Sequence, residues 1–220
     1  MTSQVLPRAV ESEPGGRRGI RLAVAITLTA WFLLVVSFGA VGAFIGPPGK
    51  PPLPIAIGVA APLLFFLVWM RLSQSFRKFV LSLDLRLIAG MQAWRFAGLG
   101  FIFLYAHNVL PAVFALPAGL GDMAIGVAAP WMMLALVRQP GFATSKAFIR
   151  WNLLGTLDLV VAVSIGALNA MFTTGAPGEI STGPMATLPL LLIPAFLVPL
   201  FVMLHIAALL QSRQLIRNRA

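Results

Sequence analysis

Basic residues are distributed along this chain in a one-sided pattern. Six long apolar segments alternate with polar gaps, and fifteen of the sixteen Lys and Arg residues fall in gaps that would lie on one side of a membrane, whereas only Lys50 falls on the other. A helix of about 20 apolar residues crosses the hydrocarbon core of a bilayer, and positive charge marks the cytoplasmic loops of membrane proteins. The pattern predicts a multi-pass membrane protein with both termini in the cytoplasm.

The apolar segments predict a single all-α domain. We expect an integral membrane bundle of six transmembrane helices within residues 20–220, with spans at about 22–45, 53–70, 93–110, 117–137, 151–172 and 185–210. Residues 1–19 combine Pro, Gly and Glu with little apolar content, which predicts a disordered cytoplasmic tail. A bacterial inner membrane is the expected location of such a protein.

The gap between the second and third spans contains an apolar helical face. Its residues recur at the spacing of one side of a helix, namely Phe76, Phe79, Val80, Leu83 and Leu87. Basic residues on the opposite face would reach lipid headgroups, so we expect a helix that lies in the inner interface of the membrane. The alternative is a cytoplasmic extension of the third span.

Composition excludes several classes of function. The chain is 59% hydrophobic and 10% charged, which leaves too little polar surface for a water-soluble core. It has no Cys for thiolate metal sites, only two His residues, and no GxxxxGK[ST] loop for a nucleotide phosphate. The net charge of +10 is divided among short loops, where the lipid bilayer and its anionic headgroups would neutralise it. We therefore expect no cofactor, no metal and no nucleic-acid partner.

Four ionisable side chains lie inside the predicted spans: His107, Asp122, Asp158 and His205. Such side chains are costly in a membrane unless they are paired or hydrated. Counted from the nearest basic residue at a rise of about 1.5 Å per residue, Asp158 and His205 lie about 12 Å deep, His107 about 18 Å and Asp122 about 24 Å. We expect two pairs, Asp158 with His205 toward the inside and His107 with Asp122 toward the outside.

A polar path through the bundle is the first functional hypothesis. Asn169 follows Asp158 by eleven residues, so it returns to nearly the same helix face and extends the polar line outward. Because histidine titrates near neutral pH, paired Asp and His residues would carry protons. This favours a small transporter or proton-coupled permease for a small molecule or ion. The alternative is that each pair is a hydrogen bond that locks neighbouring helices.

The two aspartates stand in similar surroundings. Segments 119–127 and 155–163 both read Gly-x-x-Asp-x-x-apolar-small-Val, and the spans that contain them run in opposite directions. Inverted repeats of this kind occur in many secondary transporters, where the binding site lies between them. The repeat therefore favours the transporter hypothesis.

Gly119-Leu120-Gly121-Asp122 also resembles the GxGD motif of intramembrane aspartyl proteases. That resemblance implies a hydrolase in which Asp158 is the second acid and the two carboxyls activate a water molecule. Here the GxGD acid precedes its partner in the chain, and no Pro-Ala-Leu tripeptide is present. The depth count separates the two acids by about 12 Å, whereas carboxyls that share a proton must lie within hydrogen-bond reach.

A further set of residues stands at the inner ends of predicted spans. Aromatic and basic residues at such positions usually contact headgroups, so we expect headgroup contacts, or an anionic substrate on either arginine, for Trp94, Arg95, Arg150, Trp151 and Asn152. Two other hypotheses stay open. The chain is a non-enzymatic subunit or scaffold in a homo-oligomer or larger membrane complex, or His107 and His205 ligate a haem from opposite faces.

Overall fold

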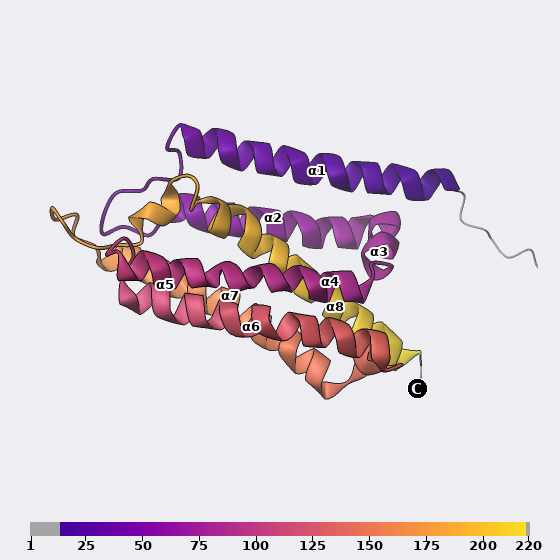
Figure 1. The fold of residues 1–220 in the computed structure, drawn as a ribbon. Helices are drawn as coiled ribbons and strands as arrows, with labels where there is room; N and C mark the ends of the chain where they lie inside the picture. The colour runs from indigo at the N-terminus through magenta and orange to yellow at the C-terminus, as the bar shows by residue number, and fades with distance from the viewer. Residues whose placement is uncertain (1–13, 219–220) are drawn as a thin grey trace, which may run out of the picture.

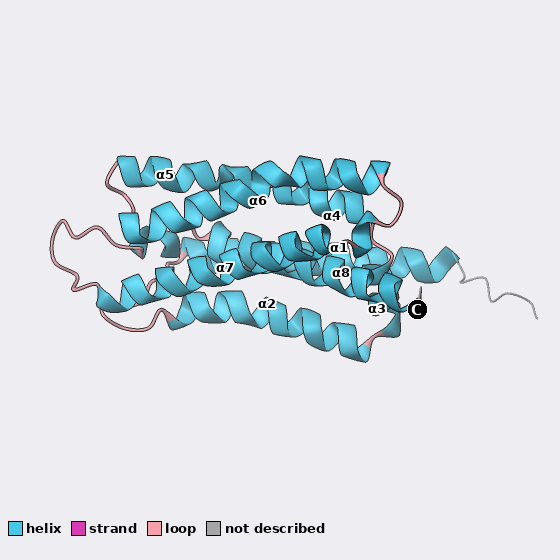
Figure 2. Cartoon of the chain, turned by 90° about the horizontal axis from the view of Figure 1, so that it is seen from below, coloured by secondary structure: helices cyan, strands magenta, loops and turns pink. Residues whose placement is uncertain are grey.

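The computed structural model describes residues 14–218, and every regular element in that range is a helix (Figures 1 and 2). The elements, in chain order, are α1 (Pro14–Ala40), α2 (Leu53–Leu72), α3 (Gln74–Leu81), α4 (Leu85–Met91), the 3₁₀ helix η1 (Gln92–Gly98), α5 (Leu99–Ala106), α6 (Ala112–Arg138), η2 (Phe142–Thr144), α7 (Lys146–Phe172), η3 (Gly183–Ala186), the π-helical turn η4 (Ile193–Leu197) and α8 (Val198–Arg217).

Six helices in the described range are long and apolar enough to cross a membrane, which confirms the predicted number of spans. They cover Arg18–Ala40, Leu53–Leu72, Leu85–Ala106, Ala112–Arg138, Lys146–Phe172 and Ile193–Arg217. Large apolar side chains face outward along them, among them Leu33, Leu64 and Leu154, each more than half exposed. A surface of this kind suits lipid rather than water. The chain therefore has the architecture of a multi-pass membrane protein.

The spans differ from their predicted boundaries mainly in the third and sixth. The third begins at Leu85 rather than near residue 93, because α4, η1 and α5 follow one another without a break. The sixth begins at Ile193 rather than residue 185, after the short helix η3, and extends to Arg217. The predicted tail of residues 1–19 falls largely outside the described residues, but α1 already includes residues 14–19.

The amphipathic segment between the second and third spans forms two helices. Phe76 and Val80 of α3 are buried, whereas Leu87 belongs to α4 and is 67% exposed. Asp84 caps the start of α4 by accepting a hydrogen bond from the backbone N–H of Arg86, which separates the two helices. The predicted apolar face therefore holds only over α3.

Helices η1 and α6 approach each other closely at the centre of the bundle. A Cβ on Gly98 would lie 2.9 Å from the carbonyl oxygen of Gly119, and a Cβ on Gly119 would lie 2.8 Å from that of Gly98. Small residues allow backbones in membranes to pack at this distance. The contact brings the middle of the third span against the fourth span beside Asp122.

Candidate functional site

Arg95 lies in the middle of the third span, ten residues after Leu85 and eleven before Ala106. It belongs to η1, whose three residues per turn place residues three apart on one face. Gln92, Arg95 and Gly98 therefore share a face, and all three are buried. The 3₁₀ segment thus directs an arginine side chain into the bundle at half the length of its span.

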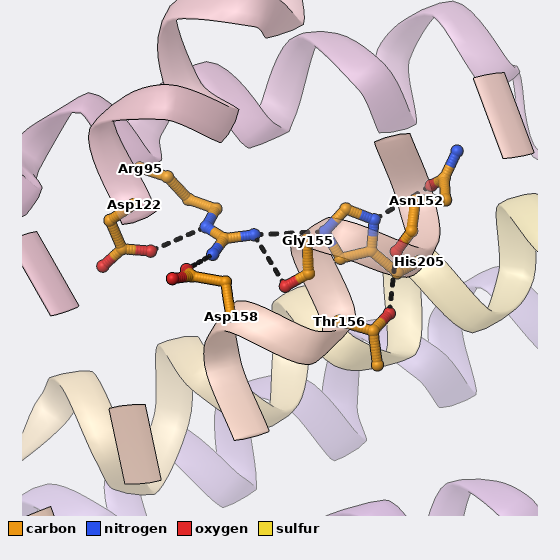
Figure 3. Close-up of polar contacts among 7 residues, drawn as sticks. All are labelled: Arg95, Asp122, Asn152, Gly155, Thr156, Asp158 and His205. Atoms are coloured by element: carbon orange, nitrogen blue, oxygen red, sulfur yellow. Dashed lines mark hydrogen bonds and ion pairs between the residues drawn. The ribbon is translucent and has the colours of Figure 1, made fainter. Parts of the chain in front are cut away.

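Two carboxylates contact the guanidinium of Arg95 (Figure 3). The Nε atom donates to Oδ1 of Asp122 at 2.7 Å, and Nη2 donates to Oδ2 of Asp158. Nη1 donates to the carbonyl oxygen of Gly155 at 3.1 Å. The Arg95 side chain is 1% exposed, and each aspartate side chain is 16% exposed. A buried arginine is tolerated when its donors are satisfied in this way.

His205 lies on the other side of the guanidinium and completes a polar cluster with Arg95, Asp122, Asp158 and Asn152. Its Nε2 lies 3.2 Å from Nη1 of Arg95, and its Nδ1 lies 2.9 Å from Oδ1 of Asn152. Because Arg95 can only donate, Nε2 accepts, and the proton is on Nδ1, which donates to Asn152. The amide of Asn152 in turn donates to the carbonyl oxygen of Phe148 at 2.9 Å. The network assigns His205 as a neutral imidazole.

Two glycines make room for this cluster. A Cβ on Gly121 would collide with the carboxylate of Asp158, and a Cβ on Gly155 would collide with the ring of His205 and lie 3.1 Å from Nη1 of Arg95. The first glycines of the two Gly-x-x-Asp segments differ in what they pack against: Gly155 lies against His205, whereas Gly119 lies against Gly98. Small residues near each aspartate therefore serve the packing of one shared centre.

A cavity of about 200 Å³ reaches this centre from the opposite end of the bundle to the C-terminus. Its walls come from α2, α5, α6, α7, the loop after α1 and the start of the sixth span, and they are mostly apolar, with Phe101, Phe114 and Leu159 among them. Lys50 and Thr182 line it near the loops, and Asp122 lines it in the middle of the bundle. Asp122 therefore contacts Arg95 and also lines the cavity.

Two buried polar side chains near the centre have no hydrogen-bond partner in the described part of the chain. Neither amide atom of Gln92 is bonded, although its side chain is fully buried, and the indole N–H of Trp151 is also unpaired. The Trp151 ring meets that of His205 edge to face, with centroids 5.7 Å apart. Such unpaired buried groups are rare in native structures and call for an explanation.

The predicted Asp and His pairs are wrong. Asp122 and Asp158 both bind Arg95, and His205 bonds Asn152 and Arg95 instead of Asp158. His107 is exposed at the end of α5, where its Nδ1–H donates to the carbonyl oxygen of Phe103 at 2.9 Å. For His107 the depth count took Arg95 as the membrane boundary, whereas Arg95 lies in mid-span. For Asp158 and His205 the count gave depth alone and left out Arg95, which contacts both.

Asn169 lies nearer the outer loops than the cluster does. Its Oδ1 accepts a hydrogen bond from the backbone N–H of Thr182 at 3.0 Å, and its carbonyl oxygen accepts one from the hydroxyl of Thr173. Thr182 lines the mouth of the cavity. The structure therefore brings Asn169 to the loop at the cavity mouth rather than to the two aspartates.

The residues expected at the headgroups divide into two groups. Trp94, 78% exposed, and Arg150 lie on the outside of the bundle. Arg95, Trp151 and Asn152 are buried, so the expected headgroup contacts are wrong for these three. The physical reason is that α4 and α7 begin at Leu85 and Lys146, which carries the three residues at least a helical turn further into the bundle than the sequence suggested.

Sequence reasoning missed the central role of Arg95, although one signal was available. Two acids in mid-span need a base, and Arg95 is the basic residue within an otherwise apolar stretch, nine residues beyond Arg86. A charge count over the spans would have paired it with the acids. Nothing comparable in the sequence points to Gln92.

The geometry also bears on the two alternative chemistries. The carboxylates of Asp122 and Asp158 lie on either side of one guanidinium, and no hydrogen bond joins them to each other. A hydrolase with a shared proton would need that direct contact. Both ring nitrogens of His205 are hydrogen-bonded, which leaves neither free for a haem iron. The described residues contain no group of three or more His, Cys, Asp or Glu that could hold a metal ion.

Comparison with known proteins gives a family and no function. No curated protein matches the chain, and no solved structure matches it. A family model described as "Domain of unknown function (DUF8737)" matches residues 51–213, which is about three quarters of the chain and includes the whole polar cluster. The match begins after α1 and ends within α8. The chain therefore belongs to the DUF8737 family.

Proposed function

We propose that this protein is a small proton-coupled permease and that Asp122, Arg95 and Asp158 form its proton-binding centre. One observation carries the proposal: two carboxylates contact one buried guanidinium in mid-span, and one of them lines a cavity that leads to the loops. Ionisable residues at such positions usually mark ion pathways or proton relays. Everything else in the proposal follows from the charges and neighbours of these three residues.

The charge of the centre favours exchange of a single proton. With both carboxylates ionised the three side chains carry a net charge of −1, because His205 is neutral. A single proton on either carboxylate brings the net charge to zero. A net charge in the low-dielectric interior is costly. Proton uptake from the cavity therefore stabilises the bundle. Proton release leaves an ionised carboxylate, which then needs another cationic partner or contact with water.

The cavity indicates the kind of substrate. Its walls are mainly apolar, and Asp122, whose Oδ1 already accepts a hydrogen bond from Arg95, lines its inner end. A small molecule of low polarity, neutral or with one positive charge, matches such a lining. Bound next to Asp122, a cationic group would compete with the proton for the same carboxylate, which is one simple way to couple the two.

Gln92 and Trp151 support an inner half of the path. Both carry buried polar atoms without partners among the described residues. Gln92 precedes Arg95 in the third span and Trp151 precedes Asp158 in the fifth, and both spans begin at the end of the bundle that holds the C-terminus (Figure 1). Unpaired donors and acceptors are costly as purely structural elements. In a proton path they would hydrogen-bond to the water molecules that carry protons between Asp158 and the inner loops.

The proposed orientation places that end in the cytoplasm. Twelve of the fourteen described Lys and Arg residues lie at the end with α3 and the C-terminus, Arg95 lies in mid-span, and Lys50 lies in the loops at the other end. Positive loops stay on the cytoplasmic side. On this basis both termini are cytoplasmic, α3 lies at the inner interface, and the membrane is a bacterial inner membrane.

Proton flux into liposomes tests the proposal. The purified protein is reconstituted with a trapped pH-sensitive dye, and flux is driven by a potassium diffusion potential. We expect wild-type flux above that of empty liposomes and loss of flux in Asp122→Asn and Asp158→Asn. Either variant leaves Arg95 paired with the other aspartate, so the protein should remain folded. His107→Gln is the matched control, because His107 is exposed outside the cluster.

Two results would overturn the proposal. Proton flux with the wild-type protein no greater than that of empty liposomes, with or without candidate amines in the lumen, would contradict the proposed transport. Proton flux in Asp158→Asn equal to that of wild type, at equal amounts of inserted protein, would indicate that the cluster only holds the helices together.

A membrane subunit without its own activity is the second candidate, and α1 favours it. Within the described part of α1, only Val35 and Gly39 are buried, so most of this helix faces outward. The outward face of such a helix is available for contact with a transmembrane helix of a partner protein. Co-purification of a stoichiometric second protein, together with absence of flux, would favour this candidate.

A further inference from the structure

We propose that a pocket at the C-terminal end of the bundle binds a doubly charged phosphate group, as found on a phospholipid headgroup or on a soluble phosphomonoester. The pocket has a volume of about 510 Å³ and lies between α3 and the last turns of α8. Figures 1 and 2 both place α3 beside this end of α8. Four bases and two amides line it: Arg77, Lys78, Arg213, Arg217, Gln74 and Gln214.

The four bases have no acidic partner among the residues that the structure describes. Asp84, the acid nearest to α3 in the chain, is held by Arg86 through contacts of 2.7 to 3.1 Å. Arg213 and Arg217 are four residues apart on one helix, where like charges repel. Four positive charges around one cavity therefore favour an anion with more than one charge.

Phosphate suits the geometry of these donors. Guanidinium groups bind phosphate oxygens through paired N–H contacts, and an ammonium group adds a compact positive charge. Arginines from two different elements can contact different oxygens of the same phosphate. A single carboxylate would satisfy fewer of the donors that line the pocket.

The pocket is held in shape by contacts outside it. The side-chain amide of Gln211 donates to the carbonyl oxygens of Val80 at 3.0 Å and Leu83 at 3.1 Å, which fixes the end of α3 to α8. The ring of Phe76 stacks on Trp69, with centroids 4.0 Å apart and planes 6° apart, which fixes α3 to α2. A site that is already formed loses little entropy when its ligand binds.

Apolar residues beside the bases favour a lipid as the source of the phosphate. Met70, Leu81 and Leu210 line the same pocket, and Leu72 nearby is 82% exposed. An acyl chain would lie along these side chains while the phosphate contacts the arginines, as expected for headgroup sites between membrane helices. A soluble phosphomonoester would use only the polar wall.

Binding of defined lipids tests the site. Protein in a neutral detergent is titrated with dioleoyl phosphatidic acid, with dioleoyl phosphatidylcholine, and separately with glycerol 3-phosphate. Bound lipid is counted by native mass spectrometry, and stabilisation is followed by thermal unfolding. The pocket variant is Arg77→Gln with Arg213→Gln. The matched control is Arg138→Gln with Arg150→Gln, which removes two exposed charges at the same end of the bundle but outside the pocket.

We expect wild type to prefer phosphatidic acid to phosphatidylcholine. At about 1 kcal/mol for each basic residue near an anionic headgroup, the pocket variant should bind phosphatidic acid about 30-fold more weakly, whereas the control changes little. Stabilisation by glycerol 3-phosphate as strong as that by phosphatidic acid, and lost in the pocket variant, would support the site with a soluble ligand. Equal losses in pocket and control variants, or no preference in wild type, would overturn it.

Discussion

At the scale of single residues, Arg95 is the side chain on which the polar centre depends. It bonds Asp122, Asp158, Gly155 and His205 and is almost completely buried. Removal of an aspartate leaves a balanced ion pair, whereas removal of the arginine leaves two carboxylates without a cation. The two kinds of variant should therefore differ sharply in stability.

Arg95→Gln should lower the free energy of unfolding by about 3–5 kcal/mol, because two largely buried carboxylates lose their partner. Unfolding in detergent, followed by circular dichroism, measures the effect. Arg86→Gln is the control: its ion pair with Asp84 is exposed to solvent and should contribute little to stability. Equal loss of stability in the two variants would contradict the assignment of Arg95 as the central cation.

Gly121→Ala should disturb the cluster through a single methyl group. The new Cβ collides with the carboxylate of Asp158, and overpacking of this kind typically costs about 1–3 kcal/mol. Gly100→Ala in α5 meets no atom within 4 Å, so it should be neutral or stabilising by up to about 1 kcal/mol. Thermal unfolding of the two variants side by side checks the difference, and a neutral Gly121→Ala would contradict the observed packing.

At the scale of elements, the outer loop between α7 and η3 is organised by one acid. The carboxylate of Glu179 accepts hydrogen bonds from the backbone N–H groups of Thr174, Gly175 and Ala176 and from the Thr174 hydroxyl, at 2.8 to 3.3 Å. The N–H of Thr174 is the main reason that the pKa of Glu179 lies below its ordinary value of 4.5. The loop also contributes Thr182 to the mouth of the cavity.

The order of this loop should therefore depend on pH. Because the pKa is lower in the folded loop than in the unfolded chain, the stabilisation is complete above pH 4.5 and is lost as the pH falls through the folded pKa. Hydrogen exchange of the three amides, corrected for intrinsic rates, measures it. Glu179→Gln should show weak protection at every pH, and unchanged protection in that variant would contradict the role of the carboxylate.

The third span shows how helix type determines which side chains meet at this site. In a continuous α-helix, residues three apart are offset by about 60° around the helix axis. The 3₁₀ segment instead aligns Gln92, Arg95 and Gly98 on one face. Gly98 meets α6, and Arg95 reaches α6, α7 and α8. A change of helix type over seven residues thus assembles the centre.

At the scale of the whole molecule, charge and exposure divide the bundle into two ends. Basic residues are concentrated at the end of the bundle with α3 and the C-terminus. The other end contains Lys50, Glu179 and the proline-rich loop after α1. The family match covers α2 to most of α8 and leaves out α1, which also buries little surface in the described bundle. The part of the chain that matches the family is therefore the set of spans from α2 onward.

The proposed orientation has a direct test because the chain contains no Cys. Single cysteines at two exposed positions, Ala176→Cys in the outer loop and Ser82→Cys after α3, are labelled with a membrane-impermeant maleimide on intact cells. We expect labelling at 176 without lysis and at 82 only after lysis, because positive loops remain inside. The reverse pattern would invert the topology and place the cavity mouth in the cytoplasm.

The sequence by itself determined the helical class and the six spans, because bilayer thickness sets the length of each apolar run and charges mark its ends. It also identified Asp122, Asp158 and His205 as unusual residues. Only the tertiary structure decided that Arg95 joins them, because helix type, starting point and rotation within the bundle determine which side chains meet. Those quantities depend on contacts such as Gly98 against Gly119, between residues far apart in the chain, and no local pattern encodes them.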